Sequence, residues 1–217
     1  MITVSAFKWV PPFAQGLVRD LRVRWALEEA GLPYEARLID PQTQKSADYR
    51  AQQPFGQVPV FQEDGLTLFE SGAIVVHLAL KSEALFPKDE AGRARALTWV
   101  FAALNSLEIH LQQLAEIDLF TPEAQWAKLH RPDVEKQTHH RLGELATWLG
   151  NREYLEDRFT AGDLMMATVL RILRHTEVLD AHPTLKAYKE RCEARPAFQR
   201  ALAAQMEAFQ QHERREA

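Results

Sequence analysis

The beginning of the chain shows the alternation of apolar and polar side chains that is typical of half-buried β-strands. One alternating run begins at Ile2, and a second covers residues 34–38. Two further apolar runs, residues 58–62 and 66–69, flank an Asp-Gly step at residues 64–65. A period of two residues predicts strands, and an Asp-Gly step between two such runs predicts a tight hairpin.

Segments in which apolar residues recur at helical spacing lie between these predicted strands. The pattern around Trp25 predicts a helix that ends at Gly31, because glycine is favoured just beyond the last turn. A weaker helical pattern covers residues 43–53, and another helix is predicted from Ser71. The order of strand, helix, strand, helical segment, hairpin and helix predicts a small mixed α/β domain over residues 1–82.

The remainder of the chain shows only helical periodicity. Apolar residues recur at helical spacing in the segments 97–114, 142–149, 164–173 and 185–202. The third of these segments is apolar on nearly every side, which is typical of a helix buried in the middle of a bundle. We therefore predict an all-α second domain over residues 90–217, joined to the first by a short linker.

The predicted buried helix is preceded by Thr160, with Asp163 three positions later. This spacing has the form of a capping box, in which Asp stands where Glu is more common. We predict a structural role for these two side chains and no direct part in the chemistry.

The composition is that of an ordinary globular protein with a substantial core. Of the 217 residues, 46% are hydrophobic and 26% are charged, which argues against a disordered chain. The formal net charge of -4 lacks the basic surplus of a nucleic-acid-binding protein, so no nucleic-acid partner is predicted.

Cysteine usage and the lengths of the apolar runs favour the cytoplasm. Cys192 is the single cysteine, so no intramolecular disulfide can form, and a reducing compartment is favoured. The longest apolar run, residues 73–80, is interrupted by His77 and is too short to cross a bilayer, and the N-terminus shows no signal-peptide pattern. We therefore predict a cytoplasmic protein without a membrane partner.

Two adjacent histidines, His139 and His140, raise the question of a metal site, because Glu135 and Glu144 lie nearby in the sequence. These residues lack a closing ligand at a spacing typical of zinc. A polar helix face is the better interpretation, and no metal is predicted.

The segment of residues 53–60, with the sequence QPFGQVPV, contains the first candidate for ligand binding. Pro59 opens a predicted strand but has no N–H to donate to a ladder. If the Val58–Pro59 bond is cis, the N–H and C=O of Val58 are free to pair with an extended peptide ligand. The alternative is an ordinary trans proline in a turn, which the general scarcity of cis bonds favours for an isolated tripeptide.

A second candidate follows the predicted hairpin directly. Ser71 is a favourable N-cap, and the first turn of the helix behind it presents unpaired N–H groups that attract a carboxylate. Glu70 can accept a hydrogen bond from an ammonium group, so the zwitterionic head of an amino acid would satisfy both groups. The alternative is that Ser71 only caps its helix.

Together, these two candidates and their spacing resemble the glutathione S-transferase family. Three further segments resemble the same family: residues 27–35 at the end of the first predicted helix, residues 159–163 at the capping box, and residues 194–198 near the C-terminus. The resemblance covers almost the whole chain, and it rests on the order and spacing of these motifs.

The resemblance implies the glutathione transferase fold, with a thioredoxin-like N-terminal domain followed by an all-helical C-terminal domain. It also implies a homodimer and glutathione (γ-Glu-Cys-Gly) bound as co-substrate along the N-terminal domain. By position, Val58, which precedes Pro59, pairs with the cysteinyl backbone of glutathione. Glu70 and Ser71 hold the γ-glutamyl head.

Two further residues complete the glutathione site that the resemblance implies. Lys45 aligns loosely with a basic position that meets the glycyl carboxylate, and Gln57 contributes to the same site. For Lys45, a solvated position on the surface is an equally good interpretation.

The resemblance also implies a residue that lowers the pKa of the glutathione thiol. The family uses Tyr, Ser or Cys where the first strand meets the first helix, but the corresponding positions here hold Leu17 and Phe13. Neither side chain can donate a hydrogen bond. Cys192 lies too far along the helical domain to be the missing group, so thiol–disulfide exchange is disfavoured.

Cations near the start of the first helix are the remaining candidates for activating the thiol. A cation or a helix N-terminus stabilises a thiolate without a hydroxyl group. We predict Arg19 as the activating residue and Lys8 as the second choice; Gln15 and Arg22 lie in the same region. The alternative for Arg19 is a solvated side chain on the surface.

Two functions are consistent with the sequence. The first is a glutathione transferase of the detoxification type, which transfers glutathione sulfur to a small hydrophobic electrophile. The second is a glutathione-binding or protein-interaction module on the same scaffold without turnover, which the missing hydroxyl group favours.

Overall fold

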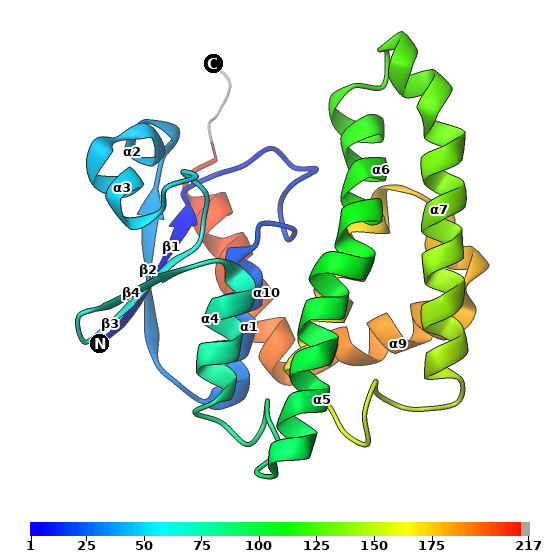
Figure 1. The fold of residues 1–217 in the computed structure, drawn as a ribbon. Helices are drawn as coiled ribbons and strands as arrows, with labels where there is room; N and C mark the ends of the chain where they lie inside the picture. Colours follow the sequence, from blue (N-terminus) through cyan, green and yellow to red (C-terminus); the bar gives the residue numbers. More distant parts are fainter. Residues whose placement is uncertain (214–217) are drawn as a thin grey trace. The chain divides into compact units, whose positions relative to one another are not determined.

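The computed structural model describes residues 1–213 of the 217-residue chain. The chain forms two compact units: Met1–Leu85 together with the segment from Arg195 onwards, and Phe86–Ala194. The first unit is of the α/β type and the second is helical, which confirms the fold class that the sequence predicts (Figure 1).

The first unit is built on a mixed four-stranded sheet with the order β2-β1-β3-β4. β1 (Ile2–Phe7) runs parallel to β2 (Tyr34–Ile39) and antiparallel to β3 (Val60–Glu63). β3 forms the predicted hairpin with β4 (Leu66–Phe69), and both residues of the Asp-Gly step adopt positive φ.

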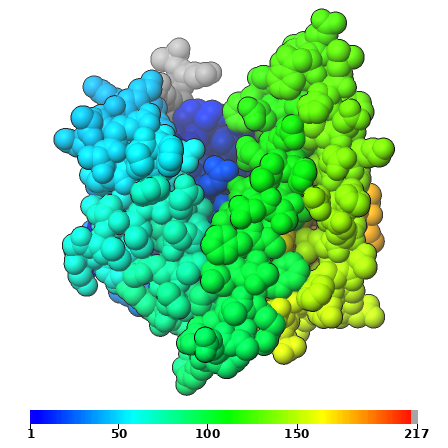
Figure 2. Space-filling model, viewed as in Figure 1, coloured from blue at the N-terminus to red at the C-terminus, as the bar shows by residue number. Residues whose placement is uncertain are grey.

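Helices connect the strands of this unit. α1 (Asp20–Ala30) leads from β1 to β2 and ends at Gly31 in the left-handed conformation, with a φ of 66°. The short helices α2 (Pro41–Lys45) and α3 (Ala47–Gln52) lead from β2 towards β3, and α4 (Ser71–Ala79) follows β4. Figure 2 shows the α2–α3 segment at the surface, in light blue.

The last helix, α10 (Pro196–Gln211), packs against α1 in the first unit. Trp25 is fully buried and meets the ring of Phe198 edge-on, with 4.8 Å between the ring centroids. The Arg195 guanidinium donates two hydrogen bonds to the Glu29 carboxylate, at 2.6 and 2.8 Å. The predicted domain of residues 90–217 differs from the structure at this helix, because the apolar face of α10 packs against α1 in the first unit.

The second unit contains only helices among the residues that the structure describes. In chain order they are α5 (Glu90–Phe101), η1 (Ala102–Glu108), α6 (Ile109–Phe120), α7 (Gln125–Leu149), α8 (Ala161–Leu170), η2 (Arg171–His175), η3 (Val178–Ala181) and α9 (Pro183–Glu193). The π-helical segment η1 interrupts the long helix that the pattern of residues 97–114 predicts. Within residues 1–213, no helix is long and apolar enough to cross a membrane.

The helix α8 is buried along its whole length, as its uniform apolar pattern predicts, and the predicted capping box starts it. Oδ2 of Asp163 accepts hydrogen bonds from Thr160 N and Thr160 Oγ1, at 2.9 and 3.1 Å. Oδ1 accepts from Leu155 N and from the Tyr188 hydroxyl, both at 2.9 Å. Burial raises the pKa of the Asp163 carboxyl, and these donors oppose that rise. The carboxylate therefore joins the start of α8 to α9 and to the segment before α8.

We expect the capping box to contribute measurably to the free energy of unfolding. Thr160→Ala should cost about 1 kcal/mol, because an N-cap bond is lost. Asp163→Ala should cost about 3 kcal/mol or more, because four buried donors lose their acceptor. Thr147→Ala is the control, since the Thr147 hydroxyl bonds only within α7, on an exposed face. Urea denaturation measures all three; an Asp163→Ala cost no larger than that of Thr147→Ala would contradict this role.

Candidate functional site

The register of the sheet brings four chain segments to one edge. β1 and β2 run parallel and therefore both end at this edge. β3 runs antiparallel to β1 and begins there, and β4 ends there, since Val60 pairs with Phe69. The residues just beyond these strand ends, among them Lys8, Val58 and Ser71, consequently emerge along the same edge of the sheet.

The peptide bond between Val58 and Pro59 is cis, as the peptide-binding interpretation requires. Both side chains are buried, with Val58 only 7% exposed. β3 begins at Val60, so Val58 lies outside the ladder. Among the described residues, no hydrogen bond uses the N–H or the C=O of Val58. One donor and one acceptor of the backbone thus remain available at the edge of the sheet.

The loop that leads to this bond is fixed by side chains from α2 and α3. Gln44 Nε2 donates to the Gly56 carbonyl at 2.5 Å, and Arg50 Nη1 donates to the Pro54 carbonyl at 3.0 Å. Gly56 has a φ of 63°, and a Cβ atom there would lie 2.4 Å from Cζ of Arg50. The positive φ favours glycine at this position, and a Cβ atom there would require the Arg50 guanidinium to shift.

The start of α4 differs in one respect from the prediction. The helix begins at Ser71, so the N-cap position falls on Glu70, and no side chain caps this end. The prediction that Ser71 is the N-cap is therefore wrong by one position. The N–H groups of the first turn have no acceptor within the helix, and this end carries the positive pole of the helix dipole.

Glu70 has an uncommon backbone conformation, and its carboxylate is exposed. Its φ is 69°, in the left-handed region that non-glycine residues seldom adopt. The side chain is exposed, and in the part of the chain that the structure describes it has no hydrogen-bond or ion-pair partner. A strained residue with an exposed carboxylate beside a helix N-terminus is typical of a ligand-binding position.

Arg22 reaches this helix end from α1. Its side chain is buried, and Nη1 donates to the Ser71 hydroxyl oxygen at 3.3 Å. A guanidinium group therefore stands next to the start of α4, where it adds positive charge to the helix dipole. The sequence places Arg22 only among the cations near the first helix, because the pattern of α1 does not reveal that this side chain reaches Ser71 in α4.

Lys8 is engaged in an ion pair. Its Nζ lies 3.1 Å from Oδ2 of Asp40, the residue that caps α2. Hydrogen bonds from the backbone and side chain of Thr43, and then from Lys8, hold the pKa of the Asp40 carboxyl well below its usual value. Lys8 thus joins the end of β1 to the start of α2.

Arg19 occupies the N-cap position of α1 and is exposed. Its side chain makes no capping hydrogen bond to the helix. Phe13, in the loop between β1 and α1, is 41% exposed, and Leu17 is half-buried. The structure therefore places two apolar side chains and one guanidinium between β1 and the start of α1, the region in which the sequence predicts the activating group.

The remaining predicted binding residues lie on the α2–α3 side of the edge. Lys45 is the last residue of α2 and is exposed. The side chain of Gln57 is exposed, whereas its carbonyl is used inside the protein, where it accepts a hydrogen bond from the Tyr49 hydroxyl at 2.7 Å.

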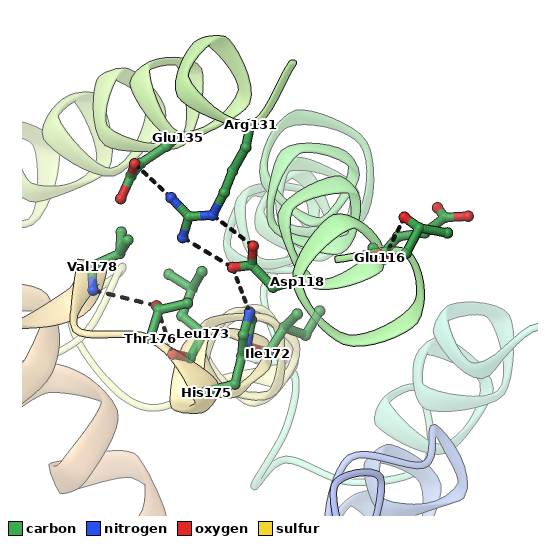
Figure 3. Close-up of polar contacts among 10 residues, drawn as sticks. Glu116, Asp118, Arg131, Glu135, Ile172, Leu173, His175, Thr176 and Val178 are labelled. Carbon is green, nitrogen blue, oxygen red and sulfur yellow. Dashed lines mark hydrogen bonds and ion pairs between the residues drawn. The ribbon is translucent and has the colours of Figure 1, made fainter. Parts of the chain in front are cut away.

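The helical unit carries a separate polar cluster, shown in Figure 3. The Arg131 guanidinium donates two hydrogen bonds to the Asp118 carboxylate, at 2.6 and 3.1 Å, and one to Glu135 at 2.9 Å. His175 Nε2 lies 3.3 Å from Oδ2 of Asp118. The cluster lines a cavity of about 680 Å³ beside α6, α7 and η2. Because its charged groups bind one another, the cluster ties these helices together.

The two adjacent histidines of α7 face different neighbours. Nδ1 of His139 lies 3.0 Å from Nε2 of His182, and Nε2 of His140 lies 3.4 Å from the Glu144 carboxylate. Burial, and then the proximity of His139, lower the pKa of His182. Over residues 1–213, no three metal-ligating side chains converge on one point.

Comparisons with known proteins identify the family. The family model for the N-terminal domain of glutathione S-transferase matches residues 14–80, and the model for its C-terminal domain matches residues 119–196. A probable glutathione S-transferase, GSTF2, from Oryza sativa subsp. japonica is 31% identical over 192 residues, which is 80% of this chain and 86% of that protein. The chain belongs to the glutathione S-transferase family.

Other similar proteins show the range of this family. The disulfide-bond oxidoreductase YfcG of Escherichia coli (strain K12) is 30% identical over 192 residues, or 81% of this chain and 86% of that protein. A glutathione transferase structure from Burkholderia graminis, with two glutathione molecules bound per subunit, has a TM-score of 0.81 at 27% identity and covers 94% of this chain and 88% of that one. Family membership alone therefore leaves the reaction open.

We expect Gly56→Ala to destabilise the glutathione S-transferase fold more than Gly65→Ala. Both glycines have positive φ, but a Cβ atom at Gly65 would meet nothing within 4 Å. Left-handed alanine costs about 1–2 kcal/mol at either site, and Gly56→Ala should lose about 1 kcal/mol more because Arg50 must leave the Pro54 carbonyl.

A double-mutant cycle in urea denaturation checks this expectation. In the background of Arg50→Ala, the cost of Gly56→Ala should fall to that of Gly65→Ala. Equal costs for the two glycine substitutions in the unaltered chain would show that Arg50 does not constrain this loop.

Proposed function

We propose that the protein is a glutathione transferase, which binds glutathione along the edge of the sheet and transfers its sulfur to a small hydrophobic electrophile. The main support is the juxtaposition of an available Val58 backbone and an uncapped helix end at Ser71. A short zwitterionic peptide needs both an extended-backbone partner and an anion site, and this edge offers the two together.

Each part of glutathione has a partner of suitable chemistry in this arrangement. The cysteinyl N–H and C=O pair with the C=O and N–H of Val58. The α-carboxylate of the γ-glutamyl residue meets the first turn of α4 at Ser71, and its ammonium group meets the exposed carboxylate of Glu70. The glycyl carboxylate extends towards Lys45 and Gln57 on the α2–α3 side.

The chemical step requires the thiolate of glutathione. Lowering the pKa of the thiol by about two units needs roughly 2.7 kcal/mol of preference for the anion. The Arg19 guanidinium and the N-terminus of α1 supply positive potential where this family places its donor. The thiol proton passes to solvent, the sulfur forms a bond to the electrophilic carbon, and the leaving group departs with its electron pair.

The ion pair between Lys8 and Asp40 weakens the case for Lys8 as the activating group. Lys8 is held 3.1 Å from a carboxylate, which neutralises much of its field. Arg19 remains our first candidate for stabilising the thiolate, and Lys8 the second.

The second candidate function is a glutathione-binding or protein-interaction module without turnover. The observation that favours it is the pair of apolar side chains, Leu17 and Phe13, at the positions of the family's donors. Under this alternative, glutathione binds at the same edge, but its thiol keeps an ordinary pKa.

We also propose that the protein acts in the cytoplasm as a homodimer in detoxification chemistry. The single cysteine supports a reducing compartment. The homodimer is implied by the resemblance to the glutathione S-transferase family. Light scattering from the purified protein tests the assembly, and a monomeric mass would remove the homodimer from the proposal.

We expect the double variant Glu70→Ala/Ser71→Ala to bind glutathione about a hundredfold more weakly, because two charge-assisted contacts are lost. Isothermal titration calorimetry measures the dissociation constant. The matched control, Glu35→Ala/Ser82→Ala, removes the same two kinds of side chain away from this edge and should bind as the unaltered protein does. Normal affinity in the Glu70→Ala/Ser71→Ala variant would show that the γ-glutamyl head binds elsewhere.

Titration of the thiol in the ultraviolet distinguishes the transferase from the module. We expect the pKa of the thiol to fall when glutathione binds, and Arg19→Ala to reverse about one unit of this fall with a roughly tenfold loss of turnover. Lys8→Ala should change the thiol pKa less. An unshifted thiol pKa in the complex of the unaltered protein would reject the transferase and leave the binding module.

A further inference from the structure

Two buried hydroxyl groups, one on Ser5 in β1 and one on Tyr49 in α3, hold the residues on either side of the Val58–Pro59 pair. The N–H of Val60 donates to Ser5 Oγ at 2.6 Å, and the Tyr49 hydroxyl donates to the Gln57 carbonyl at 2.7 Å. The two hydroxyl oxygens lie 2.9 Å apart. We call this chain of hydrogen bonds the Ser5–Tyr49 relay.

The backbone groups at the two ends of the Ser5–Tyr49 relay determine which atom donates and which accepts in each hydrogen bond. The Val60 N–H can only donate and the Gln57 carbonyl can only accept, so Ser5 Oγ accepts from Val60 and the Tyr49 hydroxyl donates to Gln57. The Ser5 hydroxyl hydrogen is then left to donate to the Tyr49 oxygen. All three bonds point the same way, and such chains strengthen one another in a buried environment.

The position of the relay follows from the cis proline that it surrounds. Pro59 has no N–H, so it cannot be anchored by donating a hydrogen bond. The anchors fall on the Gln57 carbonyl before the Val58–Pro59 pair and on the Val60 N–H after it. Because the two anchors use the backbone groups of Gln57 and Val60, the N–H and C=O of Val58 remain available for a ligand.

The rest of the unit holds the two hydroxyl groups rigidly. Ser5 lies in the central strand β1 and is 1% exposed, and Tyr49 lies in α3 and is 3% exposed. Arg37 lies over the Tyr49 ring, at 5.8 Å from its centroid, and also donates to Gln52 in α3. Burial raises the pKa of the Tyr49 hydroxyl, so it keeps its proton and stays a donor at neutral pH.

We propose that Ser5 and Tyr49 are positioning residues for glutathione, which hold the backbone of Val58 in the orientation that pairs with the cysteinyl residue. This inference rests on the proposed binding of glutathione at this edge. The hydrogen bonds of the two hydroxyl groups go to Val60, to Gln57 and to each other, and none of them goes to Arg19 or Lys8. Their loss should therefore weaken the affinity for glutathione and leave the pKa of the bound thiol unchanged.

Tyr49→Phe removes the anchor of the Gln57 carbonyl, and Ser5→Ala removes the anchor of the Val60 N–H. Each substitution removes a single oxygen atom. Tyr34→Phe is the matched control, because it removes the same oxygen from a half-buried tyrosine of β2 that lies away from the Val58 loop. Calorimetry gives the dissociation constant of glutathione, ultraviolet titration gives the pKa of the bound thiol, and circular dichroism gives the melting temperature.

We expect Tyr49→Phe and Ser5→Ala each to raise the dissociation constant about three- to tenfold, the loss typical of one neutral hydrogen bond. The thiol pKa in the complex should stay that of the unaltered protein. Tyr34→Phe should bind glutathione normally even if its melting temperature falls as far as that of Tyr49→Phe.

The outcomes separate this inference from the proposed function. If the unaltered protein does not bind glutathione, both fail. If it binds and the two relay variants bind equally well, only the positioning role is overturned. If Tyr34→Phe weakens binding as much as Tyr49→Phe does, the effect is a general loss of stability and the positioning role is again overturned.

Discussion

The candidate site depends on backbone groups of Val58 that the fold leaves unpaired at the edge of its sheet. A buried segment normally pairs every N–H and C=O, and an available pair is costly unless a ligand or water completes it. Here the strand ladder starts only at Val60, and the cis bond before Pro59 separates Val58 from it. The Ser5–Tyr49 relay anchors the same loop at Gln57 and Val60, although the N–H and C=O of Val58 between them are unpaired.

In the proposed site, the charges around the start of α4 favour a zwitterionic ligand that also pairs with the backbone of Val58. The start of α4 has no side-chain cap and lies beside the Arg22 guanidinium, while the exposed carboxylate of Glu70 precedes it. A carboxylate and an ammonium group on one carbon atom match this order of positive and negative potential. The same elements that form the sheet edge thus offer both ends of an amino-acid head their counter-charges.

Features that depend on neighbouring residues could be predicted from the sequence. The hairpin at Asp64-Gly65, the helix end at Gly31 and the capping box at Thr160 all have local causes, and the structure confirms them. Features that depend on distant residues could not be predicted. The packing of α10 on α1 joins the two ends of the chain, and the Ser5 and Tyr49 hydroxyls are 44 positions apart. The burial of Arg22 against Ser71 and the ion pair of Lys8 with Asp40 likewise appear only when the strands are in register.

A crystal structure of the protein with glutathione is the decisive test of the proposed site. We predict that the cysteinyl N–H and C=O lie within hydrogen-bond distance of the C=O and N–H of Val58, with the γ-glutamyl carboxylate at the first turn of α4. Glutathione bound at any other place, or bound at this edge with the N–H and C=O of Val58 still unpaired, would contradict this prediction.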